Sequence, residues 1–205
     1  MQQQVQIMLD LQNEMNTKVH ADWREQGFEW YRAIWIECAE MLDHYGWKWW
    51  KKQDADIDQV SLELIDIWHF GLSLLILENV QAETIAQDLQ SVLGEQNNNK
   101  KLFADTLESF VENTLRTRQF SVVGFAQLMQ CIDLSFDDLY SGYVGKNVLN
   151  FFRQDKGYKA GTYQKLWQGR EDNEHLVEIV NQLDKQAPDF KDQLYRALEQ
   201  RYQSA

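Results

Sequence analysis

The chain has 205 residues, with 20 Lys plus Arg against 32 Asp plus Glu and a formal net charge of −12. This charge argues against nucleic acid as a partner, because a large nucleic-acid interface needs a basic surface. One proline and ten glycines are few for a fold with many tight turns, so the composition favours long helices with short connections. We therefore expect a single all-α domain over residues 1–205.

Apolar residues recur at helical spacing along most of the chain. Gly46 is placed to end the second expected helix, and Asp56 or Asp58 to begin the third. The polar stretch 94–101 predicts an exposed loop. Helices are expected at about 5–16, 28–45, 56–77, 102–117, 121–132, 136–154, 172–186 and 189–203.

The N-terminus, MQQQVQIMLDLQ, has neither the basic start nor the apolar block of a targeting signal. The longest apolar region, 64–77, contains Asp66 and His69 and is shorter than the ~18 uninterrupted apolar residues of a membrane span. We expect a cytoplasmic protein without a membrane partner.

Two carboxylate pairs with a three-residue offset, Glu37/Glu40 and Glu63/Asp66, each lie on one helix face. The offset recurs elsewhere in this acidic chain, where such pairs are usually surface charge. These two pairs differ because their flanking residues, AIWIECAEML and SLELIDIWHF, are apolar. Clustered, partly buried carboxylates cannot all stay ionised without a compensating cation. An all-oxygen site favours Mg²⁺, with Mn²⁺ as a substitute, and a substrate that carries phosphate.

Two other interpretations of these acids remain open. The cluster could instead be ion-paired with Arg, Lys or Trp donors. Asp66 and His69 also match the carboxylate-x-x-His element of di-iron bundles, although that element occurs only once here.

Two further segments suggest a nucleotide site. Residues 47–52, WKWWKK, connect the acid-bearing helices, so their aromatic rings could enclose a base while the lysines face phosphates. Phe70, one turn beyond Asp66, could line the same pocket. Residues 143–170 hold six cationic side chains and only Asp155 as an acid, which indicates an anion site or, alternatively, a solvated basic face.

Four stretches resemble the dimeric all-α dUTPases, relatives of other helical nucleoside-triphosphate pyrophosphohydrolases that share an E-x-x-E…E-x-x-D metal motif. The tail GREDNEH at 169–175 is also similar, whereas 78–120 has no counterpart and would be a variable helical insert. The four stretches are LQNEMN at 11–16, WIECAEMLDHYGWKWWK at 35–51, ELIDIWHF at 63–70 and YVGKNVLNFFRQDKGYKAGTYQKLW at 143–167.

The resemblance implies a homodimer that hydrolyses dUTP, and also dUDP, by in-line attack of a water that Mg²⁺ activates. It implies that Glu37, Glu40, Glu63 and Asp66 bind the metal, and that Glu37 orients or deprotonates the water. By the same resemblance, the base pocket would hold Gln12, Asn16, Trp47 and Phe70. Sugar and phosphate contacts would come from Lys146, Asn150, Arg153, Tyr158, Lys159 and Lys165.

Two alternatives to this activity stay open. A related all-α pyrophosphohydrolase acting on a different nucleotide would keep the metal motif and change the base contacts. A non-catalytic, acidic helical interaction protein would instead keep its acids ion-paired, and added Mg²⁺ would not stabilise it.

Overall fold

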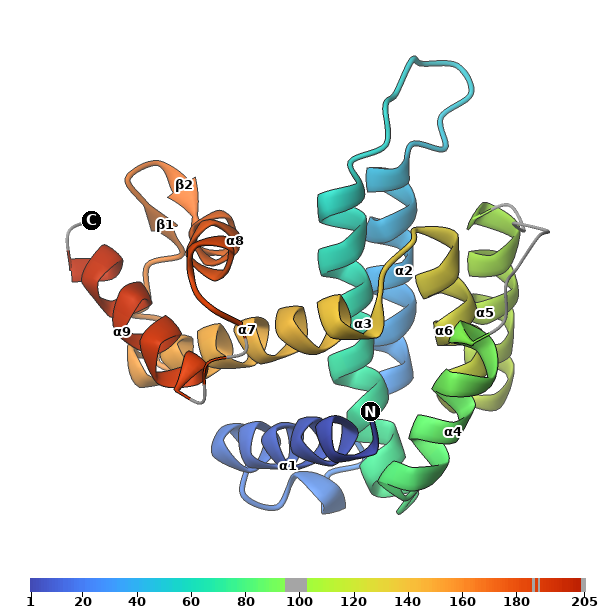
Figure 1. The fold of residues 1–205 in the computed structure, drawn as a ribbon, viewed down its shortest axis with the longest axis horizontal. Coiled ribbons are helices and arrows are strands. Elements are labelled where there is room, and N and C mark those ends of the chain that lie inside the picture. The colour runs from blue at the N-terminus through green and yellow to red at the C-terminus, as the bar shows by residue number, and fades with distance from the viewer. Residues whose placement is uncertain (95–102, 186, 188, 204–205) are drawn as a thin grey trace.

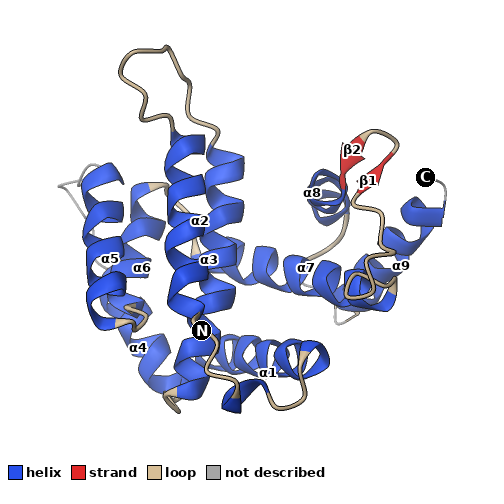
Figure 2. Cartoon of the chain, turned by 180° about the vertical axis from the view of Figure 1, so that it is seen from behind, coloured by secondary structure: helices blue, strands red, loops and turns tan. Residues whose placement is uncertain are grey.

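The computed structural model describes residues 1–94, 103–185, 187 and 189–203. Over these residues the chain is helical apart from one short hairpin, which confirms the predicted all-α fold (Figures 1 and 2). The predicted loop at 94–101 falls almost entirely outside the described residues. The elements are α1 (Gln2–Val19), the 3₁₀ turn η1 (Trp23–Glu25), α2 (Trp30–Tyr45), α3 (Ile57–Leu77), α4 (Ala82–Leu93), α5 (Phe103–Thr117), α6 (Val122–Cys131), α7 (Phe136–Asp155), β1 (Leu166–Trp167), β2 (Arg170–Glu171), α8 (Asp172–Gln182) and α9 (Phe190–Gln203).

Helix α3 forms the centre of the core, as its apolar sequence predicts. Its side chains Leu64, Ile67 and Trp68 are fully buried, because α2 lies beside it and α1 and α7 pack against it as well. The helix is long and apolar enough to cross a membrane, but 56% of its most apolar window is buried inside the protein. It therefore has the burial expected of a core helix.

The ends of α2 and α3 follow their local signals. Gly46 ends α2 in a left-handed conformation, with φ +86°, which a residue without Cβ adopts readily. Asp56 precedes α3, and its carboxylate accepts a 3.2 Å hydrogen bond from the Gln59 amide. The two helices are thus held as an antiparallel hairpin whose connection extends beyond the rest of the molecule (Figure 1).

Helix α7 links the two sides of the molecule. It runs from the α2–α3 hairpin to the part of the chain that contains α8, α9 and the two strands, while α4, α5 and α6 lie on the opposite side of the hairpin (Figures 1 and 2). Its N-cap Ser135 accepts a hydrogen bond from the Asp138 amide. Residues 143–155 of the basic segment 143–170 therefore lie on this helix, which runs away from the acidic pair on α3.

Two elements were not expected. Helix α4 lies within 78–120, which was expected to be a helical insert, but no helix was predicted at its position. The β1–β2 hairpin pairs Trp167 with Arg170 around a two-residue turn in which Gln168 and Gly169 both have positive φ. This combination is the one that favours a tight hairpin.

Candidate active site

Three acids from the two central helices converge. Glu37 of α2 and Glu63 and Asp66 of α3 each place one carboxylate oxygen so that all three atoms lie within 4.8 Å of one another. All three side chains are half-buried, whereas Glu40 is exposed and does not belong to this set. The structure thus brings together three of the four predicted metal ligands, and ligation by Glu40 stays a prediction.

The repulsion between these carboxylates favours the binding of a cation. Burial, and then the negative charges of Asp66, Glu63 and Glu40, raise the pKa of Glu37 from 4.5 to about 8. Burial and Asp66 likewise raise the pKa of Glu63. Such shifts mean that the ionised forms repel one another in a partly desolvated site. A hard divalent ion with a preference for oxygen ligands fits this donor set.

Two basic side chains lie next to the acids. Lys146, which is buried on α7, places its Nζ 2.8 Å from an Asp66 oxygen. His44 Nε2 lies 3.5 Å from Glu63. The acidic cluster is therefore partly ion-paired, as the alternative interpretation expected. However, the charge of one buried lysine offsets the charge of only one of the three carboxylates. Lys146 also provides a cation that is within reach of a phosphate bound at the acids.

A cavity of about 260 Å³ opens where α1, α3 and α7 meet, and Asp66 belongs to both the cavity and the acidic cluster. Part of its wall is aromatic, as expected for a site that encloses a planar base. The Trp30 and Phe70 rings lie 6.2 Å apart and are tilted by 34°. The cavity is lined by Gln12, Met15, Asn16, Val19, His20, Trp23, Phe28, Trp30, Asp66, His69, Phe70, Asn150, Arg153, Gln154 and Tyr158.

A buried network of polar side chains lies beside this cavity. Gln12 Nε2 donates to Asn16 Oδ1 at 2.9 Å and to Ser73 Oγ at 3.2 Å, and Asn16 Nδ2 donates to Ser73 Oγ at 3.0 Å. The hydroxyl of Tyr143 lies 3.1 Å from Gln12 Oε1. The network ties α1 to α3 and α7, and it contains the two predicted base-pocket polar residues.

His69 belongs to this network rather than to the acidic cluster. Its Nδ1 lies 2.8 Å from Gln12 Oε1, its ring stacks on Tyr143 at 4.3 Å, and burial lowers its pKa to about 4. The ring is therefore neutral near pH 7, and Nδ1 carries the proton that it donates to Gln12. This geometry gives no support to a carboxylate-x-x-His di-iron site.

Arg153 is held at the edge of the cavity by an acid that sequence reasoning did not assign. Its Nε and a terminal nitrogen donate to the two oxygens of Asp172, at 2.8 and 2.7 Å. Asp172 is fully buried, and it also accepts a bond from the Tyr163 hydroxyl at 2.7 Å. Burial alone would raise the pKa of Asp172, but these donors hold it below its usual value. The GREDNEH tail was the only sequence signal for Asp172.

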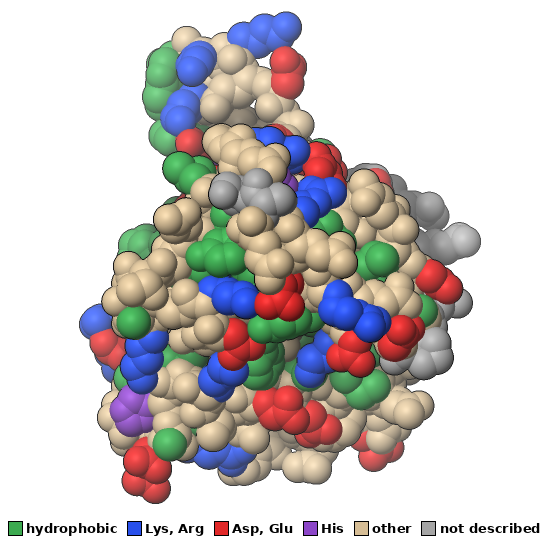
Figure 3. Space-filling view, turned by 90° about the vertical axis from the view of Figure 1, so that its left-hand side faces the viewer, with side chains coloured by type: hydrophobic (Ala, Val, Ile, Leu, Met, Phe, Trp, Pro, Cys, Tyr) green, Lys and Arg blue, Asp and Glu red, His purple; other side chains and the backbone are tan. Residues whose placement is uncertain are grey.

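Asn150 and Tyr158 also line the cavity, whereas Lys159 and Lys165 are not among its lining residues, although Lys159 contacts Val19, which is. Lys159 donates to the Val19 carbonyl at 2.7 Å, and Lys165 pairs with Glu171 at 3.1 Å. On the face drawn in Figure 3, Lys and Arg side chains alternate with Asp and Glu side chains instead of forming a separate basic patch.

Trp47 follows the far end of α2. Trp30, at the near end, faces the cavity, and the 16 residues of α2 separate the two ends by about 24 Å. The connection that carries Trp47, Trp49 and Trp50 forms the protrusion at the top of Figure 3, and these rings are 47%, 89% and 57% exposed. Trp47 therefore does not reach Gln12 within one chain.

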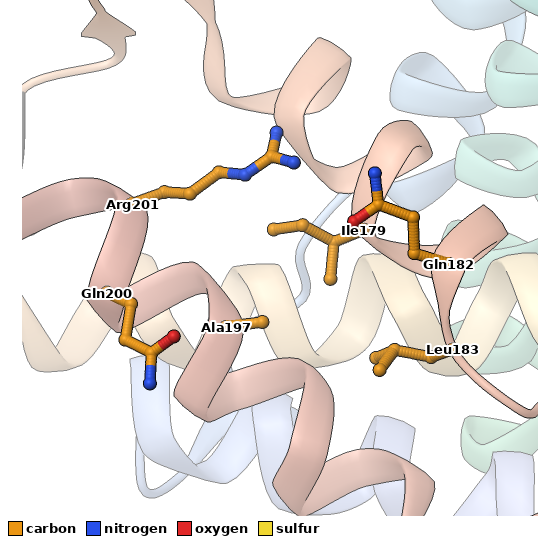
Figure 4. A pocket seen from close by; sticks show the side chains of 6 residues that line it. All are labelled: Ile179, Gln182, Leu183, Ala197, Gln200 and Arg201. Atoms are coloured by element: carbon orange, nitrogen blue, oxygen red, sulfur yellow. The ribbon is translucent and has the colours of Figure 1, made fainter.

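Two other cavities contain none of the predicted site residues. One, of about 340 Å³, lies between α8 and α9 and is lined by Arg201, two glutamines and three apolar residues (Figure 4). Arg201 donates to Glu178 at 2.6 Å. The other, of about 660 Å³, lies between α1, α7 and the start of α9. Of these three cavities, the acidic cluster borders only the one lined by Asp66.

The fold and the site place the protein among all-α hydrolases whose clustered carboxylates can hold a metal ion beside a nucleotide-sized cavity. The family described as dUTPase matches residues 4–158, and the chain belongs to this all-α dUTPase family and is thus a dUTP diphosphatase. No curated protein matches the chain. The match ends before Asp172, so the carboxylate that holds Arg153 lies beyond the matched residues.

Proposed function

We propose that the protein hydrolyses dUTP, and also dUDP, in a Mg²⁺-dependent reaction at the Glu37, Glu63 and Asp66 cluster. The observation that carries the proposal is the position of Asp66, which belongs to the acidic cluster and also lines the aromatic cavity. A nucleotide whose base occupies that cavity would therefore extend its phosphates toward the acids.

Glu37, Glu63 and Asp66 would hold the ion, and Glu40 would join them after a change of rotamer. When bound, Mg²⁺, or Mn²⁺ in its place, would supply Lewis-acid stabilisation of phosphate charge and a lowered pKa for a bound water. Glu37 would orient the attacking water and accept its proton, because its carboxylate lies among the acids that would hold the ion.

The cationic residues would act on the phosphates. Lys146 lies 2.8 Å from Asp66, so it would turn toward the phosphate when the metal compensates that acid. Arg153, held by Asp172, would present its remaining N–H groups at the cavity edge. Both cations would offset the negative charge that develops on the leaving pyrophosphate.

A homodimer is also proposed. Helix α2 exposes Trp35 and Ile36 at 36% and 42%, and a pair of exposed apolar residues on one helix supports an interface. Because Trp47 is remote from Gln12 in its own chain, its proposed base contact would be made in the other subunit's cavity. A cytoplasmic location remains part of this proposal.

The mechanism is tested by Glu37→Gln. The variant keeps the size of the side chain but cannot accept the proton, so we expect turnover of dUTP to fall by at least about 10³-fold with the fold retained. EDTA should abolish wild-type activity, and MgCl₂ should restore it. An active Glu37→Gln enzyme, or activity that survives EDTA, would rule out this mechanism.

A further inference from the structure

We propose that Ser73 determines base specificity by fixing which way the Asn16 amide faces the cavity. The inference rests on the proposed function, because it assumes that a uracil base occupies the cavity. It concerns a residue that contacts no substrate and acts through Asn16, so Ser73 is a positioning residue.

The chemical problem is how the protein distinguishes uracil from cytosine. Uracil presents the O4 acceptor beside the N3–H donor, whereas cytosine presents the N4–H₂ donor beside the N3 acceptor. A carboxamide offers one acceptor and one donor side by side, and rotation of the amide by 180° exchanges them. A freely rotating asparagine therefore fits both bases, and only an amide held in one orientation can reject one of them.

Ser73 supplies an anchor for that orientation. Its hydroxyl carries a single proton, which it donates to the His69 carbonyl one turn earlier in α3, at 3.1 Å. The oxygen can then only accept from the two amides that face it, Gln12 Nε2 at 3.2 Å and Asn16 Nδ2 at 3.0 Å. Both amides must turn their NH₂ groups toward Ser73. If Asn16 were rotated, its oxygen would face the Ser73 oxygen, and Ser73 could donate to it only by giving up its bond to the His69 carbonyl.

Gln12 reinforces the same orientation. Its Nε2 donates to Asn16 Oδ1 at 2.9 Å, so a rotated Asn16 would place one NH₂ group against another. Gln12 is itself held in place, because its Oε1 accepts from His69 Nδ1 at 2.8 Å and faces the Tyr143 hydroxyl at 3.1 Å. The single Tyr143 hydroxyl proton is shared between Gln12 Oε1 and the Met8 carbonyl at 2.9 Å, so these contacts use both N–H groups of the Gln12 amide and at least one of its lone pairs.

Asn16 is thus the amide of this pair that retains an N–H group for a ligand. It uses one N–H on Ser73 and one lone pair on Gln12, which leaves one donor and one acceptor, and it lines the cavity. Ser73 and Tyr143 are fully buried, and Gln12, Asn16 and His69 are at most 6% exposed. Water is therefore excluded from Ser73 as a substitute partner for the two amides.

The test compares kcat/KM for dUTP and dCTP in wild type, Ser73→Ala, Asn16→Ala and the double variant. Ser61→Ala is the matched control, because Ser61 makes the same hydroxyl-to-carbonyl bond, to Ile57, at the other end of α3. We expect Ser73→Ala to lower the dUTP-to-dCTP ratio by at least about tenfold, the factor that one net hydrogen bond provides. Ser61→Ala should retain the wild-type ratio.

Because Ser73 acts through Asn16, Ser73→Ala should lower the ratio no further in the Asn16→Ala background. If Ser73→Ala does not fold, Ser73→Cys, whose thiol is a weak donor and acceptor, replaces it in the same comparison. An unchanged ratio in the Ser73 variant, or a full effect without Asn16, would overturn the inference. A wild-type enzyme that hydrolyses dUTP and dCTP equally would overturn it while leaving the reaction intact. A complete lack of dUTP hydrolysis would overturn the proposed function itself.

Discussion

Replacing Glu37 with glutamine should change how the stability of the protein depends on pH and on Mg²⁺. In the absence of metal, the pKa of Glu37 is about 8 in the folded protein against 4.5 for a free side chain. Most of the wild-type molecules therefore carry a protonated Glu37 at pH 7, and glutamine resembles this neutral form. In the unfolded chain Glu37 is ionised at pH 7, so folding must protonate it, a cost that glutamine avoids; at pH 7 in EDTA we therefore expect Glu37→Gln to be more stable than the wild type.

The two proteins should have similar stabilities below about pH 4.5 and diverge as the pH rises above that value. Because the pKa of Glu37 is higher in the folded state, its contribution to stability is fully present below 4.5 and is lost as the pH rises through about 8. In EDTA the wild type should therefore lose stability relative to Glu37→Gln across this window. The side chain is partly solvated, so we expect a smaller difference than a fully buried group would give.

Mg²⁺ should reverse this order. An ion present at a hundred times its Kd stabilises the folded state by about 2.7 kcal/mol, which corresponds to roughly 5–11 °C in the melting temperature of a chain of this size. Glutamine supplies no negative charge, so Glu37→Gln should lose most of this increase. Since metal binding requires the ionised acid, the increase in the wild type should grow from pH 6 to about pH 8.

Thermal denaturation followed by circular dichroism, with EDTA or with MgCl₂ at each pH, measures all three effects. Glu14→Gln is the control, because Glu14 is an exposed acid on α1. An equal Mg²⁺-dependent increase in Glu37→Gln and wild type, or no increase in the wild type, would refute the assignment of Glu37 to a metal site.

Two further predictions follow from the contacts of α7 and α2. Asp172→Ala leaves the Arg153 guanidinium without its buried partner. Urea denaturation should therefore show that the free energy of unfolding falls by about 3–5 kcal/mol, and the KM for dUTP should rise. A fall of less than about 1 kcal/mol would mean that the ion pair is not required for stability. Because the pKa of Asp172 is lowered, its contribution should be present above the usual aspartate pKa and lost as the pH falls through the lowered value. Light scattering should give the mass of a dimer for the wild type and of a monomer for Ile36→Glu; a monomeric wild type would remove the proposed interface.

Much of the fold could be predicted because local signals and packing agree in α2 and α3. The apolar run of α3, its Asp56 N-cap and the Gly46 end of α2 all indicated the helices that the structure shows. Helix α4, within the expected helical insert 78–120, was not itself predicted, although Ala82, Ile85, Ala86 and Leu89 repeat at helical spacing and are buried. The polar residues that follow α4 indicated a loop and obscured this helical pattern.

The β1–β2 hairpin could not be predicted by periodicity, because strands of two residues are too short to show an alternation. Gly169 was its only local signal. The turn also places Gln168 at φ +51°, a conformation that glutamine adopts only when its neighbours fix it.

Some residues of the candidate site could also be predicted from the sequence, and others could not. Glu37, Glu63 and Asp66 could be predicted because their apolar flanks indicated burial on two helices. The partners of these residues could not, because they depend on the approach of distant segments. Lys146 reaches Asp66 from α7, and Ser73 meets Asn16 from 57 residues away. The resemblance named Lys165 as a phosphate contact, yet the structure pairs it with Glu171.

We propose that this all-α dUTP diphosphatase uses its carboxylate cluster to hydrolyse dUTP. The most direct measurement is pyrophosphate release from a panel of dUTP, dCTP, dTTP, dATP and dGTP, each with and without MgCl₂. We expect Mg²⁺-dependent release of pyrophosphate from dUTP and much slower release from the other four. Faster hydrolysis of any other nucleotide, or release from dUTP that does not depend on Mg²⁺, would contradict it.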